Sequence, residues 1–255
     1  MGVPAFDTPA TAAQGADFVV SMVADDDATR SVMLGAEGVV GAANPGTVII
    51  DSSTNTPSAS REVAQRAAER GIAYLDAPVS GSLPQARGRE LVFMVGGERA
   101  AFERAQPLFA AMGRQTSYMG TSGSGASIKL INNMLSGTVS TALAEALTVA
   151  EAAGLDAKAV QEVLGEGATA SRLLKGKMPK MLGRDFSPQF QLSLMEKDLR
   201  YFLALAQSVD VPAPIASLVR SQLQSARRAG LGGLDVAAVY LQSSGRQARQ
   251  GPPSE

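Results

Sequence analysis

The sequence predicts an α/β protein in which a sheet unit is followed by an all-helical unit, the two joined by one long helix. Three observations predict this fold. Short apolar runs typical of strands alternate with helical patterns up to Gly120, no strand pattern follows Gly120, and residues 126–153 contain no helix breaker except Gly137. Strands that alternate with helices form a parallel or mostly parallel sheet with helices on its faces.

Five strands are predicted in the first part of the chain. Most are short apolar runs bounded by small polar residues, glycine or proline: 17–23, 47–50, 73–76, 91–95 and a last one near Tyr118. Helices are expected from Thr8-Pro9 onwards and over 25–34, 57–70 and 98–112. Asp25, Asp26 and Asp27 suit a metal ion, but acids at a helix N-terminus also complement its dipole, so no metal site is expected.

Small polar residues gather where several predicted strands end. They lie at Asp25, at 51–54 and at 80–82. Ligands of open α/β sheets bind outside the carboxyl ends of the strands. We therefore expect a binding site along this edge.

The predicted joining helix, residues 126–153, has roughly 28 residues and a length of ~42 Å. Ser124 is a plausible N-cap and Gly154 suits the left-handed position after the last turn. Lys129 and Asn133 are four residues apart, so they lie on one face, among apolar neighbours. The glycine-rich loop, the positive helix end and Lys129 could together bind an anionic small molecule. The alternative is a lysine that snorkels to water from a structural helix, which is the commoner case for this spacing alone.

Only helices are predicted after the joining helix, over 156–170, 171–182, 191–208, 212–229 and 235–242. The pair Lys197-Asp198 lies on one of them and, taken alone, is typical of a solvated face. The tail 243–255 is polar and rich in proline and glycine, so we expect it to be disordered. The predicted domains are thus 1–123, 124–242 and the tail.

Composition excludes several classes of function. A net charge of −1 gives no electrostatic footprint for nucleic acid or a membrane surface, and no apolar run is long enough to span a bilayer. The chain has 0 histidines, which removes catalytic systems built on histidine and metal sites ligated by it. Proton transfer must then fall to a lysine, tyrosine or carboxylate, and burial can tune a lysine to a pKa of roughly 7–8. This strengthens the case for Lys129. The cytoplasm is the default location.

Five segments together resemble the β-hydroxyacid dehydrogenase family, which includes 3-hydroxyisobutyrate dehydrogenase, tartronate semialdehyde reductase and glyoxylate/succinic semialdehyde reductase. The segments occur in the family's order and the resemblance covers residues 8–242: Asp51-Ser-Ser-Thr54, Asp76-Ala-Pro-Val-Ser-Gly81, Phe93-Met-Val-Gly-Gly97, Gly120-x-x-Gly-x-Gly with Lys129-x-x-Asn-Asn133, and Lys197-Asp-Leu199.

The resemblance implies a Rossmann-type sheet domain, a helical dehydrogenase domain, NAD or NADP as cofactor and a small carboxylate as substrate. It implies that Lys129 is the catalytic lysine, which gives a proton to the carbonyl oxygen as hydride arrives. By the same resemblance Asn133 orients the substrate, and Ser80 and Gly81 hold its carboxylate. Cofactor contacts are implied for Met22, Val23, Ala24, Thr54 and Lys197. Members of the family pair through the helical domain, which implies a homodimer or homotetramer.

The sequence departs from the family in two places. The substrate loop continues as Ser82-Leu83-Pro84, bulkier and stiffer than the usual small residues, which leaves the substrate open. The family also opens with a strand, a Gly-x-Gly-x-x-Gly turn and a helix, which this sequence lacks. Gly35-x-x-Gly38-x-x-Gly41 is no substitute because it follows a helix pattern. We expect a truncated or mis-started form in which the strand 17–23 is an exposed apolar edge, and which binds nicotinamide dinucleotides poorly.

The first functional hypothesis is a nicotinamide-dependent dehydrogenase or reductase for a small β-hydroxy acid or its semialdehyde. A second is an imine-reductase-like enzyme on the same scaffold, against which the Lys129/Asn133 pair argues. A third is a catalytically weak or inactive member that serves as a dimerising scaffold. The sequence does not separate NAD from NADP.

Overall fold

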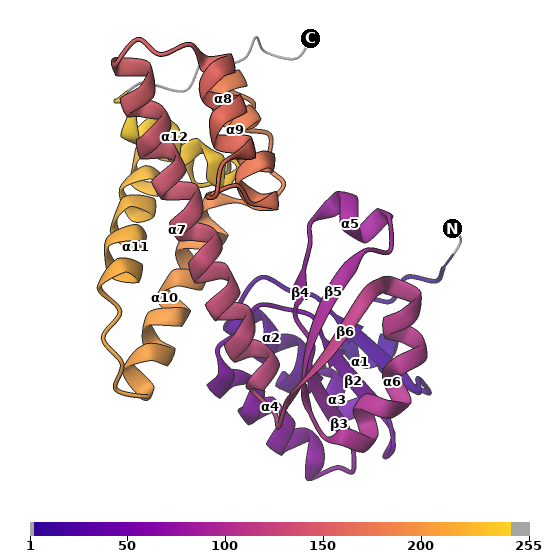
Figure 1. Ribbon diagram of the computed structural model, residues 1–255. Coiled ribbons are helices and arrows are strands. Elements are labelled where there is room, and N and C mark those ends of the chain that lie inside the picture. Colours follow the sequence, from indigo (N-terminus) through magenta and orange to yellow (C-terminus); the bar gives the residue numbers. More distant parts are fainter. Residues whose placement is uncertain (1–2, 246–255) are drawn as a thin grey trace. The chain divides into compact units, whose positions relative to one another are not determined.

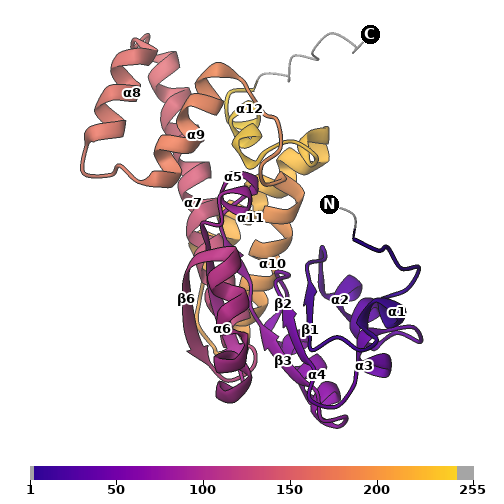
Figure 2. The same ribbon diagram turned by 90° about the vertical axis from the view of Figure 1, so that its right-hand side faces the viewer.

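The computed structural model describes residues 3–245, which divide between Ile131 and Asn132 into two compact units. We call these the sheet unit and the helical unit (Figures 1 and 2). The division falls about two turns inside the long helix, later than the predicted boundary after residue 123. The early turns of that helix therefore belong to the sheet unit, and Lys129 lies among them.

The elements of the sheet unit are α1 (Pro9–Ala13), β1 (Phe18–Ser21), α2 (Asp26–Leu34), α3 (Val39–Ala42), β2 (Val48–Asp51), α4 (Pro57–Ala68), β3 (Ala73–Asp76), β4 (Val79–Ser80), α5 (Leu83–Arg87), β5 (Leu91–Gly97), α6 (Arg99–Met112), β6 (Gly113–Gly120) and the start of α7 (Ser124–Ala152). The helical unit contains the rest of α7, then α8 (Ala157–Glu166), α9 (Arg172–Gly183), α10 (Leu192–Ser208), α11 (Pro214–Ala226), η1 (Arg227–Leu231), η2 (Val236–Ala238) and α12 (Val239–Ser243).

The sheet is mostly parallel, as predicted, but it also contains two short antiparallel pairings. Strand order is β1-β2-β3-β5-β4, and β6 also pairs with β5. The pairs β1–β2, β2–β3 and β5–β6 are parallel, but β5 runs antiparallel to both β3 and β4. The reversal arises because the chain leaves β3 through Ala77-Pro78 into β4, a strand missed in the sequence, and turns back through α5. Within the part of the chain that the structure describes, β1 pairs with β2 alone, so it is an edge strand with Val20 exposed, as expected.

Helices cover both faces of the sheet, as the sequence predicted (Figure 2). Alternate residues of a strand point to opposite faces. Val48 and Ile50 pack with α6, while Ile49 between them packs with α1 to α4. All three side chains are fully buried. An apolar run without alternation, as at 47–50, is what a strand covered on both faces requires.

The predicted acid-rich helix start is confirmed. Asp25 caps α2 by accepting a 2.9 Å hydrogen bond from the Ala28 N–H. Asp26 accepts hydrogen bonds from the N–H and hydroxyl of Thr56 at 2.8 and 2.7 Å, which ties α2 to the start of α4. Asp27 pairs with Arg30 on the same helix. These acids thus have structural partners.

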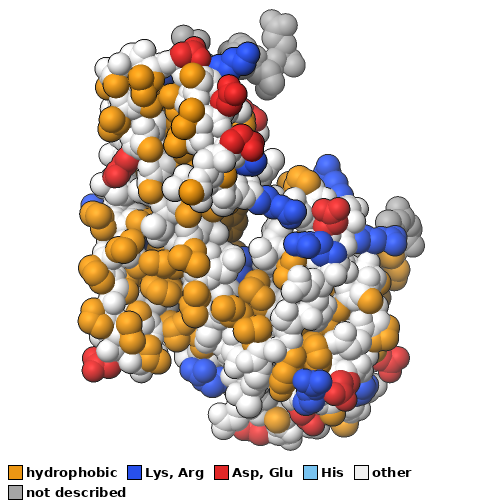
Figure 3. Space-filling model, in the orientation of Figure 1, with side chains coloured by type: hydrophobic (Ala, Val, Ile, Leu, Met, Phe, Trp, Pro, Cys, Tyr) orange, Lys and Arg blue, Asp and Glu red, His pale blue; other side chains and the backbone are white. Residues whose placement is uncertain are grey.

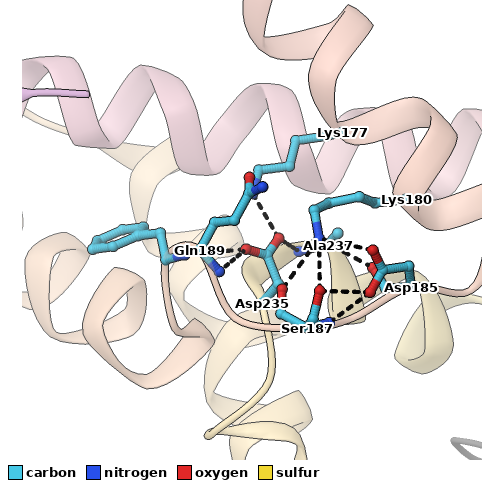
Figure 4. Close-up of polar contacts among 8 residues, drawn as sticks. Lys177, Lys180, Asp185, Ser187, Gln189, Asp235 and Ala237 are labelled. Carbon is cyan, nitrogen blue, oxygen red and sulfur yellow. Dashed lines mark hydrogen bonds and ion pairs between the residues drawn. The ribbon is translucent and has the colours of Figure 1, made fainter. Parts of the chain in front are cut away.

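The helical unit closes around one apolar core, to which α7, α9, α10, α11 and the segment 231–241 contribute. A buried ion pair ties the last of these segments in place (Figure 4). Lys177 Nζ lies 2.6 Å from Asp235 Oδ1, and the other oxygen of Asp235 accepts the N–H groups of Gln189 and Phe190. Burial alone would raise the pKa of Asp235, but the hydrogen bond and charge of Lys177 hold it below its usual value.

The predicted helices of this unit are found, with ends shifted by a few residues. The helix predicted over 212–229 ends as α11 at Ala226 and continues into the π-helical turn η1, which contains Gly230 at φ 85°. Of the tail predicted to be disordered, Ser243 closes α12, and residues 246–255 lie outside the described part. None of the described helices is both long and apolar enough to cross a membrane.

Candidate active site

The loops that follow β1 and β2 are fastened to each other. The Val23 N–H donates a 2.9 Å hydrogen bond to Ser53 Oγ, so Met22, Val23 and Ala24 lie beside the loop that carries Thr54. Met22 is 69% exposed and presents an apolar surface at the carboxyl end of β1. The predicted cofactor-contacting residues of the sheet unit therefore lie on neighbouring loops.

A buried carboxylate holds the second of these loops in place. Asp51, at the end of β2, accepts hydrogen bonds from Ser53 N–H (3.1 Å), Asn55 Nδ2 (2.9 Å) and the Tyr74 hydroxyl (2.7 Å). Burial, together with the charge of Asp51, raises the pKa of Tyr74 well above its usual value, so the hydroxyl remains a donor. The sequence motif Asp51 to Thr54 is thus a turn built around its own aspartate.

Ser80 and Gly81 lie elsewhere on the sheet. Ser80 ends β4 opposite Val92 of β5, at the far end of the strand order from β1. Gly81 has φ +130°, and a Cβ there would stand 2.9 Å from the Gln85 Cβ, so only glycine fits. Gln85 accepts a 2.9 Å hydrogen bond from the Ser82 N–H, which fixes the turn into α5. The segment Ser82-Leu83-Pro84, which departs from the family's loop, therefore begins the short capped helix α5.

The glycine-rich turn before α7 already binds an anion, and that anion is part of the protein. Asp76, at the end of β3 and 2% exposed, accepts hydrogen bonds from Gly123 N–H at 2.8 Å and Ala126 N–H at 2.9 Å. The sequence left open that these loop amides bind an external anion, and for these two the Asp76 carboxylate is the acceptor instead. Ser124 is the first residue of α7 rather than its cap.

Burial raises the pKa of Asp76 to about 6, while the hydrogen bonds from Gly123 and Ala126 act to lower it. The carboxylate is therefore costly to bury in its ionised form, and the amides at the helix start offset only part of that cost. Sequence reasoning quoted Asp76 as part of a motif and assigned it no role. The sequence feature that could have indicated a role for Asp76 was its position at the end of a buried strand.

Lys129 and Asn133 lie one turn apart on α7, as predicted. Asn133 is buried, and its Nδ2 donates a 2.6 Å hydrogen bond to Asp198 Oδ2. Lys197 Nζ lies 3.2 Å from the other oxygen of the same carboxylate. The helical unit thus brings Asn133 and Lys197 together through Asp198.

The interpretation of Lys197-Asp198 as a solvated face is wrong. Asp198 is 1% exposed and Lys197 is buried as well, because α10 packs closely against α7. A Cβ on Gly137 would stand 3.0 Å from Leu199 Cδ2 and 3.2 Å from Met195 Sδ. The sequence analysis named Asp198 within this pair and within the Lys197-Asp-Leu199 segment but assigned it no role.

The described residues fit one part of a dinucleotide site. The segment Met22–Ala24 and the loop that carries Thr54 together offer an apolar surface and fixed backbone groups, which suit a ribose and a nicotinamide ring. Gly35, Gly38 and Gly41 do not form a phosphate-binding turn, because they follow α2 and lead into α3 rather than joining a strand to a helix.

Comparison with known protein families matches nearly the whole chain. Residues 1–120 match the NAD binding domain of 6-phosphogluconate dehydrogenase, and residues 123–242 match the NAD-binding domain of NADP-dependent 3-hydroxyisobutyrate dehydrogenase. Both models describe nicotinamide-dependent enzymes, which supports NAD or NADP as the cofactor.

Individual relatives agree with these models. The 2-(hydroxymethyl)glutarate dehydrogenase of Eubacterium barkeri is 34% identical over 93% of this chain and 79% of its own length. The structure of the 3-hydroxyisobutyrate dehydrogenase of Mycobacterium tuberculosis with L-serine is 31% identical, with a TM-score of 0.82 over 92% of this chain and 82% of that one.

A further relative has a name that is not an enzyme's. The cytokine-like nuclear factor N-PAC of Xenopus tropicalis is 33% identical over 91% of this chain, but the match spans only 44% of that longer protein. Family models match both units, and the enzyme relatives match over most of their own length, so they are a better guide to the family than this name. The chain belongs to the β-hydroxyacid dehydrogenase family of NAD(P)-dependent oxidoreductases.

Proposed function

We propose that this protein transfers a hydride between NAD(P) and a small β-hydroxy acid or its semialdehyde, with Lys129 as the general acid and base. The observation that carries the proposal is the pair on α7: a lysine one turn before a buried asparagine whose amide is fixed by Asp198. The chain has 0 histidines, so no histidine competes with the lysine for proton transfer.

In the proposed reduction the Lys129 ammonium donates its proton to the carbonyl oxygen, which becomes the hydroxyl of the product. In the reverse direction the neutral amine accepts the hydroxyl proton. A cation beside the oxygen also stabilises the negative charge that develops there. When bound, the nicotinamide cofactor supplies or accepts the hydride. We propose that Met22, Val23, Ala24, Thr54 and Lys197 contact it.

The names of the enzyme relatives narrow the substrate class. 2-(Hydroxymethyl)glutarate, 3-hydroxyisobutyrate and L-serine each carry a primary alcohol on the carbon next to the carbon that bears the carboxylate. We propose the same arrangement for the substrate here, with Ser80 and Gly81 receiving the carboxylate and Asn133 orienting the molecule. The Ser82-Leu83-Pro84 segment next to them leaves the rest of the substrate open.

Replacement of Lys129 tests the proposal. Lys129→Ala should lower turnover by about 10²–10⁴-fold, the usual contribution of a general acid, because the variant lacks the ammonium that donates the proton. Cofactor affinity, measured by fluorescence titration, should stay within a factor of about 2 of the parent if the lysine acts in chemistry rather than in binding.

Lys158→Ala is the matched control, since Lys158 is an exposed lysine on α8. Turnover retained in Lys129→Ala would remove the lysine from the chemistry, and with it the proposal. The imine-reductase alternative would be favoured if the parent reduced cyclic imines and left β-hydroxy acids unchanged.

A non-catalytic, dimerising role is the second candidate, which we keep because one relative, N-PAC, is named as a nuclear factor rather than as an enzyme. We propose a homodimer or homotetramer through the helical unit in either case. Exposed apolar side chains on that unit support the proposal (Figure 3), among them Val209, Val211, Ile215 and Leu218. Self-association without measurable NAD(P)H binding would favour the scaffold over the enzyme. The cytoplasmic location stays a prediction.

A further inference from the structure

We infer that Asp76 is a positioning residue, whose carboxylate seats the first turn of α7 on the sheet and so sets the position of Lys129. The inference rests on the role proposed for Lys129. It concerns the sheet unit alone, because Asp76, Gly123, Ala126 and Lys129 all lie before the division at Ile131.

The first argument is that both oxygens of the Asp76 carboxylate accept hydrogen bonds from N–H groups at the start of α7. Oδ1 accepts the Gly123 N–H at 2.8 Å and Oδ2 accepts the Ala126 N–H at 2.9 Å. The first N–H groups of a helix have no partner within the helix, so an outside acceptor must satisfy them. A side chain from β3 thus provides the cap that a local serine or aspartate usually provides, which fixes α7 to the sheet and not only to its own loop.

The second argument is the close packing around that carboxylate. A Cβ on Gly96 would stand 2.7 and 2.8 Å from the two oxygens of Asp76, and 2.8 Å from the Gly125 backbone nitrogen. Asp76 and Gly96 are paired across β3 and β5. Because Gly96 has no Cβ, the helix start can approach the sheet until its N–H groups reach the carboxylate.

The third argument is the free-energy cost of keeping the buried Asp76 carboxylate ionised. Burial raises the pKa of Asp76 to about 6, so at neutral pH the fold keeps ionised a group that it would hold more cheaply with a proton. Titratable groups around it include Asp51 on β2, its register partner, and Tyr74 on β3, and the side chain of Arg61 on α4 lies against Gly123. A buried charge that weakens the fold is typical of a functional site.

Lys129 lies three residues after Ala126, so it is about one turn from the Asp76 hydrogen bond. A helix is rigid over that distance, and any shift of its first turn moves the lysine by a similar amount. Loss of alignment by about 1 Å can cost an enzyme on the order of 10²-fold in rate. Asp76 would thereby act on the reaction without touching the substrate.

The test uses Asp76→Ala and Asp76→Asn in the full chain, with Asp51→Asn as matched control. Asp51 is also buried at the end of a neighbouring strand, but its partners Ser53, Asn55 and Tyr74 lie outside α7. In Asp76→Ala, amide exchange at Gly123 and Ala126 should become about tenfold faster, since both N–H groups lose a cap. Exchange in α9 should be unchanged.

The rate of chemical acetylation of Lys129, measured relative to the rates of the exposed Lys158 and Lys175, reports on the position of its side chain. We expect the relative rate to rise at least about threefold in Asp76→Ala and not in Asp51→Asn, because only the first loosens α7. For enzyme that turns over, kcat should fall about tenfold or more in Asp76→Ala while the KM for cofactor changes little.

If Asp76→Ala does not fold, Gly96→Ala gives the same test, since the added methyl displaces the carboxylate without removing it. Faster exchange at Gly123 and Ala126 with unchanged acetylation of Lys129 would overturn the positioning role. So would a loss of protection spread evenly over the sheet unit. Exchange and acetylation do not depend on turnover, so they decide the role of Asp76 even where Lys129→Ala shows that the proposed function is wrong.

Discussion

At the scale of single residues, buried aspartates organise this protein more than its exposed charges do. Asp51, Asp76, Asp198 and Asp235 are nearly inaccessible to water, and each accepts hydrogen bonds or pairs with a lysine from elsewhere in the chain. A buried carboxylate demands such partners, because leaving it unpaired is costly. Each therefore joins segments that are distant in sequence.

The raised pKa of Asp76 predicts how stability depends on pH. The unfolded side chain ionises near pH 3.8 and the folded one near 6, so the folded state holds the proton more tightly. The stabilisation from that proton is complete below pH 3.8 and is lost as pH rises through 6. Between these values the free energy of unfolding should fall by about 3 kcal/mol through this group.

Urea unfolding of the parent and of Asp76→Asn at pH 4, 5, 6 and 7 measures this contribution. The asparagine does not titrate, so the difference in unfolding free energy between the two proteins should change with pH in the stated direction. Other carboxylates, including Asp235 with its lowered pKa, act equally in both proteins and cancel. A difference that stays constant over this range would contradict the assignment.

At the scale of elements, α7 depends on its packing with α10. Gly137 lets the two helices approach, and one turn earlier Asn133 donates to Asp198 across the same contact. Asp198→Ala should lower the free energy of unfolding by about 3–5 kcal/mol, since it leaves the buried Lys197 ammonium without its carboxylate. Denaturant titration measures this.

Asp198→Asn is the matched variant, because its side-chain oxygen can still accept from Asn133 while the charge is lost. We expect it to lie between Asp198→Ala and the parent in stability. Equal stability of all three proteins would show that α7 and α10 hold together through apolar contacts alone.

Much of this element structure could be predicted from local sequence. Helix starts at Thr8, Asp25 and Thr56 have recognisable caps, and the long helix was placed within two residues at its N-terminus. The short strand β4 and the reversed direction of β5 could not be predicted, because the pairing of a strand depends on partners far away in sequence.

Two interpretations at the candidate site, that of the glycine loop and that of the Lys197-Asp198 pair, were wrong for a related reason. The glycine loop and the Lys197-Asp198 pair were recognised, but their hydrogen-bond partners lie 47 or 50 and 65 residues away in the chain. Spacing on one helix can show that Lys129 and Asn133 share a face. It cannot show that Asp76 fills the loop or that Asp198 is buried beneath Asn133.

At the scale of the whole molecule, the family assignment rests on both units, and the helical unit leaves apolar side chains on its surface. Ile215 and Leu218 of α11 are 58% and 64% exposed, whereas Ala216, Val219, Leu223 and Ala226 of the same helix face the core. A surface helix usually has one apolar stripe, and a second exposed one is typical of a contact with another protein.

The double variant Ile215→Glu/Leu218→Glu should therefore convert the proposed homo-oligomer into single chains. Two charges in the centre of an apolar contact lose their hydration without gaining partners, which can weaken association by several kcal/mol. Size-exclusion chromatography with light scattering gives the mass directly. Ser217→Glu adds a charge at an exposed position that lies about 100° or more around the same helix from Ile215 and Leu218, and it should leave the mass unchanged. If the double variant keeps the parent's mass while circular dichroism shows intact helices, association does not use this face of α11, and the apolar stripe needs another partner.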